Sequence, residues 1–277
     1  MCLISIAWRA HPRYRLVLLA NRDEEFGRPT AAAAFWSERP DILGGRDLRA
    51  GGTWLGVAAD GRFGALTSFR RPADKRDGAP SRGELVSGYL TGGDAPAEYV
   101  RAVASRSAEY NGFNLLVGDG DSLLSFSNRG NGVEPVEPGV HGLSNHLLDT
   151  PWPKVQRAKR RLADLVGRTF GIEEGFQLLD DTERAARPEL PDTGMGIEAE
   201  ERLSAIRLPA EGGYGTRCST VLLLGEDGSI EFAERTWGED QAAKGTVSFR
   251  LGPEEARARA ASRHAVSPPR ETPLPVR

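Results

Sequence analysis

Short apolar runs joined by tight-turn dipeptides dominate this chain and restrict it to a fold rich in antiparallel sheet. Asp-Gly separates two apolar runs at residues 60–61, 119–120 and 227–228. Asp and Gly tolerate the positive φ angles of a two-residue hairpin turn, so each dipeptide predicts a hairpin. Two further runs, Cys2–Trp8 and Tyr14–Ala20, are too short for helices and rich in Ile, Leu and Val. They predict a fourth hairpin of buried strands.

Three segments instead have helical character. Arg82–Leu90 follows Ser81, with Glu84 three residues after Ser81 as in a capping box, and Pro153–Thr169 has apolar residues on one face. Ala97–Arg106 is the third helix. The strands expected at the Asp-Gly turns are Trp54–Ala59, Phe63–Phe69, Phe113–Val117, Leu123–Asn128, Thr220–Leu224 and Ile230–Thr236. This order predicts an α+β fold of mostly antiparallel sheets with segregated helices, arranged as two stacked sheets with helices outside.

The chain is expected to form one domain. Its 277 residues can bury a substantial core, and no repeat is visible. We expect a single domain over residues 1–252 and a disordered tail over 253–277, where no apolar period remains. Residues 183–215, rich in Glu, Pro and Gly, are expected to form a long surface loop or lid.

Composition excludes several classes of function. The formal net charge of −3 argues against nucleic acid as a partner. No run of 18 apolar residues is present, so a membrane span is not expected. Two cysteines, Cys2 and Cys218, predict no disulfide framework and suit a reducing cytoplasm. Cys and His lack the spacing of a metal site, so no metal is expected.

Cys2 is the strongest candidate for chemistry. Removal of Met1 would leave a thiol and a free α-amine on one residue. An α-amine has a pKa of about 7.7–8.0, so a fraction of the amine is unprotonated at neutral pH and can accept the thiol proton. The structural alternative is a small apolar residue that opens a buried strand.

The polar segment Asn21–Glu25 should lie next to Cys2. It ends the second strand of the first hairpin, and that end lies beside the start of the first strand. The guanidinium of Arg22 would stabilise a thiolate, and a carboxylate such as Asp23 would hold the α-amine or orient the arginine. A solvated charged turn is the alternative.

Two later segments carry further candidates. Asn145, at the end of Gly142–Asn145, can donate to a developing oxyanion, or it is a turn residue before a helix that starts with proline. Arg217 precedes an apolar strand and either binds a carboxylate or is an ordinary cation at a strand edge. His146 is a candidate base or haem ligand, with a surface or capping role as its alternative.

These motifs occur in an order that resembles one known family. They are Met1-Cys2, Asn21–Glu24, Arg28-Pro29, Phe35-Trp36, Gly51–Gly56, Ala65–Thr67, Arg82–Val86, Tyr110–Leu115, Asn128–Gly130, Gly142–Asn145, Thr150–Trp152 and Tyr214–Arg217. The chain closely resembles the Transport and Golgi organisation protein 2 family, also called NRDE proteins. That family in turn resembles the N-terminal-nucleophile hydrolases of the penicillin V acylase and choloylglycine hydrolase group.

The resemblance implies a four-layer αββα sandwich and a set of site residues. The implied catalytic residues are Cys2, Arg22, Asp23, Asn145 and Arg217. The relatives space their arginine and aspartate further apart, so Glu24 or Glu25 is an alternative carboxylate. Their second oxyanion donor would fall near Thr67 or Ser68, where this chain has no asparagine.

We therefore expect a cysteine N-terminal-nucleophile hydrolase acting on a small linear amide or acyl compound. Asn21, Glu24, Thr67, Ser68, Trp54 and Trp152 are the expected substrate contacts. The alternative is a protein that binds and traffics haem or acyl-CoA and lipid, with Trp36, Trp54 and Trp152 lining its pocket. No cofactor is required; haem would be cargo, with Cys2, His146 and Cys218 as candidate ligands. A homodimer is compatible with the sequence.

Overall fold

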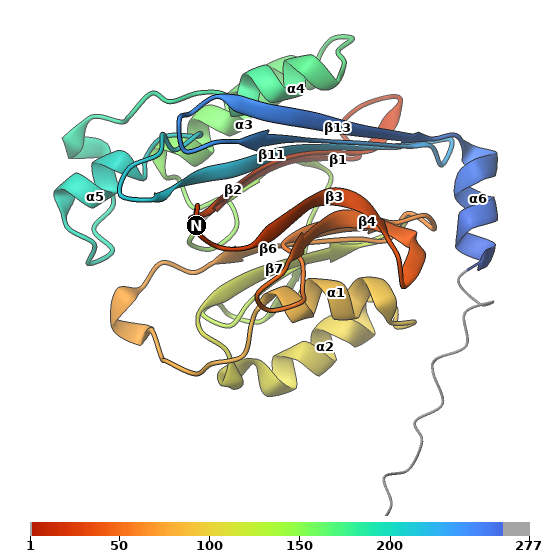
Figure 1. Cartoon of the computed structure of the whole chain (residues 1–277), viewed down its shortest axis with the longest axis horizontal. Helices are drawn as coiled ribbons and strands as arrows, with labels where there is room; N and C mark the ends of the chain where they lie inside the picture. The colour runs from red at the N-terminus through yellow and green to blue at the C-terminus, as the bar shows by residue number, and fades with distance from the viewer. Residues whose placement is uncertain (1, 263–277) are drawn as a thin grey trace, which may run out of the picture.

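Two antiparallel sheets stack face to face at the centre of the molecule, as shown by a computed structural model that describes residues 2–262 (Figure 1). The six-stranded sheet has the order β10-β1-β2-β11-β12-β13, and the seven-stranded sheet runs from β3 to β9 in sequence order. The first contains β1 (Cys2–Trp8), β2 (Tyr14–Glu25), β10 (Gly139–Leu143), β11 (Tyr214–Gly225), β12 (Ile230–Trp237) and β13 (Ala243–Leu251). The second contains β3 (Thr30–Trp36), β4 (Arg39–Asp47), β5 (Leu55–Ala58), β6 (Phe63–Ser68), β7 (Phe113–Gly118), β8 (Leu123–Ser127) and β9 (Val133–Pro135).

Helices cover the outer face of each sheet, which gives the four layers expected of an αββα sandwich (Figure 1). The helices are α1 (Gly83–Thr91), α2 (Pro96–Arg106), α3 (Pro153–Val166), α4 (Ile172–Leu179), α5 (Ile197–Arg202) and α6 (Pro253–Ser262). The pair α1 and α2 packs on the seven-stranded sheet, and the pair α3 and α4 packs on the six-stranded sheet. No described helix is long and apolar enough to cross a membrane.

Strand β1 shows how the alternation of side chains along a strand places them in different layers. Ile4, Ile6 and Trp8 belong to the cluster between the two sheets, whereas Leu3 and Ala7 pack beneath the helices. Successive residues of a strand point to opposite faces, and here both faces are buried, so the strand reads as continuously apolar. Cys2 is two residues before Ile4, so its side chain points to the same face of the strand, toward the layer between the sheets.

The structure corrects two expectations about local structure. Residues 253–262, expected to be disordered, form α6: Ala256 is buried and the Arg259 guanidinium lies 4.0 Å from the ring centroid of Phe35. Because Ala256 is the buried residue of this short helix, the sequence of α6 shows no repeating apolar pattern from which a helix could be predicted. Residues 263–277 lie outside the described part of the chain. At α1 the expected Ser81 cap does not form, because the N-cap is Arg82 without a side-chain cap bond.

The segment between α4 and β11 is largely irregular, as expected for residues 183–215. It contains the 3₁₀ turn Arg187–Glu189 and the short helix α5. Glu200 of α5 is 2% exposed and forms an ion pair with Arg70, at 2.5 Å between Nη1 and Oε2. Because this pair is buried, it fixes α5 against the end of β6.

Candidate active site

Strand register brings Cys2 and the polar end of β2 together. Cys2 lies opposite Arg22 in the β1–β2 pairing, and on the other side of β2 Thr216 lies opposite Asp23. The prediction that Asn21–Glu25 reaches the start of the first strand is therefore confirmed, although this segment belongs to β2 rather than following it.

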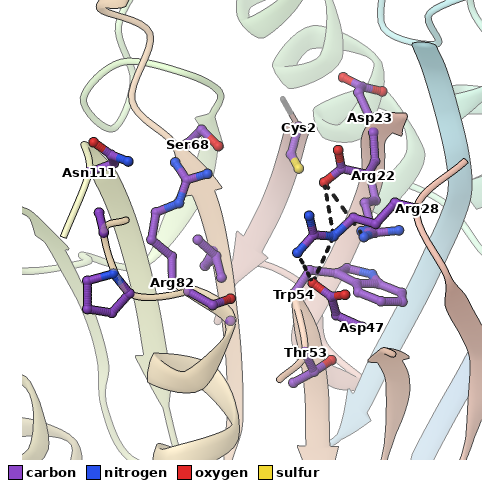
Figure 2. Close-up of a pocket in the computed structure, with 16 residues that line it drawn as sticks. Cys2, Arg22, Asp23, Arg28, Asp47, Thr53, Trp54, Ser68, Arg82 and Asn111 are labelled. Carbon is purple, nitrogen blue, oxygen red and sulfur yellow. Dashed lines mark hydrogen bonds and ion pairs between the residues drawn. The ribbon is translucent and has the colours of Figure 1, made fainter. Parts of the chain in front are cut away.

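A pocket of about 290 Å³ opens at these strand ends, next to the N-terminus of α1 (Figure 2). Its polar lining residues are Cys2, Arg22, Asp23, Glu24, Arg28, Asp47, Thr53, Ser68, Ser81, Arg82 and Asn111. Trp54 and Leu66 provide apolar surface. The pocket is thus small and mostly charged, with one thiol in its wall.

The thiol of Cys2 is not activated by its surroundings alone. Burial raises the pKa of Cys2 above its ordinary value, whereas a hydrogen bond from the backbone N–H of Asp23 and the charge of Arg22 lower it. The net direction is upward, so the resting group is a thiol at neutral pH. A nucleophilic role for Cys2 therefore requires a base that removes the proton during attack.

Arg22 is held rigidly beside the thiol. Its side chain is 6% exposed, and its guanidinium carbon lies 4.2 Å from the ring centroid of Trp54. Nη1 donates to Thr30 Oγ1 at 3.1 Å, and Nη2 lies 3.8 Å from Glu24. Stacking and hydrogen bonding together fix a cation next to Cys2.

A second arginine closes the same wall. Arg28 donates through Nε and Nη2 to Asp47 Oδ2 at 2.9 and 2.6 Å, and its Nε lies 3.9 Å from Glu24 (Figure 2). Burial raises the pKa of Asp47, but the hydrogen bond and charge of Arg28 outweigh it and hold that pKa below its ordinary value. Arg28 and Asp47 are thus both ionised at neutral pH.

Asp23 lines the pocket on the same side as Arg22 and Arg28 (Figure 2). It is buried, and Thr216 Oγ1 donates to its Oδ1 at 2.6 Å. Burial is the largest influence on the pKa of Asp23 and raises it. Asp23 therefore lies beside the start of β1, where its neighbour Arg22 pairs with Cys2.

A buried cluster of charges lies near Asp23. It contains the Arg70–Glu200 pair and Lys154, the second residue of α3. Lys154 is 1% exposed, and its Nζ has no hydrogen-bond partner among the described residues. Burial, followed by the charge of Arg70, lowers the pKa of Lys154 to about 8. None of these three residues was among the predicted site residues.

Asn145 and Thr67 lie beside the pocket but do not line it. Asn145 is fully buried; its Nδ2 donates to the Ser68 carbonyl at 2.9 Å and its Oδ1 accepts from Arg70 at 3.2 Å. Thr67 Oγ1 donates to the Ser144 carbonyl at 2.5 Å. The expected oxyanion donor therefore supports the segment that carries Ser68, and Ser68 itself lines the pocket.

Arg217 lies at a β-bulge in the pairing of β11 with β2, between Thr216 and Cys218. Its Nη1 donates to the backbone carbonyls of Glu25, Phe26 and Arg28, at 2.7, 3.0 and 3.2 Å. Burial lowers its pKa. Arg217 is absent from the pocket wall and instead fixes the turn that presents Arg28.

The remaining expected contacts divide between the pocket and the core. Glu24, Ser68 and Trp54 line the pocket. Asn21 is buried outside it, where Nδ2 donates to the carbonyls of Leu179 and Ile206. Trp152 packs in a small cluster under α3.

Six polar residues of the pocket wall were not among the predicted site residues: Arg28, Asp47, Thr53, Ser81, Arg82 and Asn111. Arg28 and Arg82 could have been identified from the sequence, because both belong to the motifs on which the family resemblance is based. Asn111 lies inside such a motif too. Asp47 ends β4, a strand that the apolar pattern did not predict.

Comparison with known proteins agrees with this architecture. The sequence matches the family described as Transport and Golgi organisation 2 over residues 1–239. A Transport and Golgi organization protein 2 homolog from Bos taurus is 37% identical over 285 residues, spanning 91% of this chain and 99% of the homologue. A Mus musculus homologue is 36% identical over 261 residues, spanning 85% of this chain and 93% of its own length.

Among solved structures, the fold is similar to that of the C2A mutant of a conjugated bile acid hydrolase from Clostridium perfringens. The TM-score is 0.52 at 9% sequence identity, over 91% of this chain and 92% of that one. The expected sandwich of N-terminal-nucleophile hydrolases is thus confirmed at the level of fold. With family matches over most of its length, this chain belongs to the Transport and Golgi organisation 2 family.

Proposed function

We propose that the protein is an N-terminal cysteine hydrolase that cleaves a small linear amide or acyl compound. The observation that carries the proposal is the position of the Cys2 thiol, in the wall of a charged pocket and opposite Arg22 in the strand register. The similarity in fold to a hydrolase, whose C2A mutation also changes residue 2, supports the same scaffold for chemistry. Two free cysteines suit a protein working in the cytoplasm.

The reaction requires removal of Met1. The free α-amine of Cys2 then accepts the thiol proton while sulfur attacks the carbonyl carbon of the substrate. Collapse of the tetrahedral intermediate breaks the bond to the leaving group, which takes the proton from the ammonium and departs. Water attacks the resulting thioester, again losing a proton to the amine, and releases the carboxylic acid and free thiol.

Neighbouring residues tune these steps. The cation of Arg22 favours the thiolate, and the buried carboxylate of Asp23 orients the ammonium that forms. We assign the oxyanion contact to Ser68, whose side chain lines the pocket opposite Cys2. Asn145 then acts as a positioning residue, because its amide holds the Ser68 carbonyl.

The pocket supports a small substrate better than haem cargo. Of the three tryptophans considered as apolar lining, only Trp54 reaches the pocket, while Trp36 and Trp152 pack in the core. Among the candidate haem ligands, His146 and Cys218 lie outside it. A volume of about 290 Å³ is at the lower end for ligand pockets, and most of an acyl-CoA would lie outside it.

The test is a comparison of three proteins that differ at the amino terminus: the processed chain, the chain with a short N-terminal extension, and Cys2→Ala. Single-turnover acylation by an activated acyl ester or thioester is followed in each. We expect rapid acylation in the processed chain and at least about 10²-fold slower acylation in the extended chain, which keeps the thiol but lacks the base. Equal rates in these two proteins would contradict the mechanism.

A further inference from the structure

Arg82 differs from the other two arginines of the pocket in having no carboxylate partner. Arg22 lies within 4 Å of Glu24, and Arg28 binds Asp47. Among the described residues, none of the acidic side chains lies within that distance of the Arg82 guanidinium. Its one hydrogen bond is from Nη1 to the backbone carbonyl of Gly112, at 3.0 Å. The pocket therefore contains a fixed cation whose remaining N–H groups are free to bind a ligand.

The surroundings of Arg82 make this unpaired charge unfavourable. Arg82 is half-buried, and burial is the largest influence on its pKa, which is lowered. It is the N-cap of α1, and no side chain caps that terminus, so the positive end of the helix dipole adds to its charge. A cation that is partly withdrawn from water is stabilised by an adjacent anion, and the described residues supply none in direct contact with Arg82.

The position of Arg82 relative to Cys2 defines what such an anion would belong to. Figure 2 shows the two side chains entering the pocket from opposite walls, with Ser68 on the Arg82 side. A molecule that fills this volume of about 290 Å³ would therefore contact both walls at once. Its reactive carbonyl would lie at the thiol and its anionic end at the guanidinium.

We propose that Arg82 binds the carboxylate of the substrate, so that the protein acts on small amides or acyl compounds that carry a free carboxylate. A guanidinium matches a planar carboxylate with two parallel N–H···O bonds, which favours this group over a neutral end of the same shape. The proposal rests on the proposed function, since it uses Cys2 as the reacting group.

The test uses two alkylating reagents that differ only at the end distant from the reacting carbon, N-bromoacetylglycine and N-bromoacetylglycinamide. In both, the Cys2 sulfur displaces bromide: a carbon–sulfur bond forms, the carbon–bromine bond breaks, and the thiol proton passes to solvent. Peptide mass spectrometry identifies the modified residue and separates Cys2 from Cys218. The measured quantity is the rate with the acid divided by the rate with the amide, which cancels changes in thiol reactivity.

Three variants isolate the role of Arg82. Arg82→Gln removes the charge, and Arg82→Lys keeps the charge but lacks the planar guanidinium that can form two parallel hydrogen bonds. Arg71→Gln removes one charge from a side chain that is 64% exposed and outside the pocket. We expect the ratio to fall about tenfold in Arg82→Gln, to fall less in Arg82→Lys, and to change less than about twofold in Arg71→Gln.

The outcomes separate the two proposals. Alkylation of Cys2 with the same ratio in the unmodified protein and in Arg82→Gln would overturn the carboxylate site and leave the nucleophile intact. Failure of both reagents to modify Cys2 would overturn the proposed function, and the carboxylate site with it. Circular dichroism of each variant confirms that the fold is kept.

Discussion

Replacing Lys154 with methionine should stabilise the folded protein at neutral pH. Lys154 is 1% exposed, and its ammonium has no hydrogen-bond partner among the described residues. Its pKa is lowered from the ordinary 10.5 to about 8, chiefly by burial. At about 1.4 kcal/mol per pKa unit, keeping this charge in the folded state costs about 3 kcal/mol at pH 7. Methionine has a similar unbranched stem and carries no charge, so Lys154→Met should increase the free energy of unfolding by about that amount.

The gain should depend on pH with a defined sign. Between pH 8 and 10.5 the folded protein has lost the Lys154 proton while the unfolded chain still binds it. The unmodified protein therefore gains stability relative to Lys154→Met as pH rises through this window, and the difference between them should approach zero near pH 10.5. Taking the difference removes the contribution of groups that titrate equally in both proteins.

Urea unfolding at several pH values between 7 and 10.5 measures this difference. Lys159→Met is the matched control, because Lys159 is on the same helix but its side chain is 26% exposed and its ammonium is paired with Asp149 at 2.6 Å. We expect that variant to change stability by less than about 1 kcal/mol. A Lys154→Met protein that is less stable at pH 7, or a difference that does not shrink with pH, would refute the reasoning.

Three further predictions follow from buried contacts. Glu200→Gln leaves the Arg70 guanidinium buried without its carboxylate and should lower the free energy of unfolding by about 3–5 kcal/mol in urea; a loss below about 1 kcal/mol would contradict it. Asn145→Ala should slow single-turnover acylation, but by less than the about 10²–10³-fold lost with a direct oxyanion donor, because Asn145 only holds the segment that carries Ser68; an unchanged rate would remove Asn145 from the site. Gly52→Ala would place a Cβ 2.4 Å from the carbonyl carbon of Gly83, so α1 must shift; its melting temperature should fall by several degrees, and an unchanged melting curve would show that the loop yields freely.

The part of the site that depends on one hairpin was predictable from the sequence. Cys2 and Arg22 are neighbours because two consecutive strands pair, and their register follows from the apolar pattern and the turn between them. The overall layers were predictable for the same reason, since most strands occur in hairpins with clear turn signals.

The rest of the pocket wall was not predictable from local pattern. Arg28 and Asp47 depend on β3 and β4; β3 is rich in alanine, and β4 contains proline and glycine, which weakens a strand pattern. Edge strand β13 was not predicted, although Val247, Phe249 and Leu251 alternate with polar residues and pack against the core between the sheets. Arg82 stands at the start of a correctly predicted helix, but only the packing of that helix on the sheet shows that its side chain faces Cys2.

The roles of Asn145 and Arg217 show a third limit. Both residues lie close to the site, yet their polar atoms bind backbone carbonyls of the segments that carry Ser68 and Arg28. A sequence motif marks that a residue is needed near a site, but it does not say whether the side chain contacts the substrate or its support. That distinction depends on contacts more than 70 residues apart in the chain.

The most direct test of the central claim is the intact mass of the untagged protein, quenched during reaction with an activated acyl ester. The account predicts a mass that lacks Met1 and carries one acyl group, with fragmentation placing that group on the Cys2 sulfur. A protein that retains Met1, or one that lacks Met1 and never acquires an acyl group, would contradict Cys2 as an amino-terminal nucleophile.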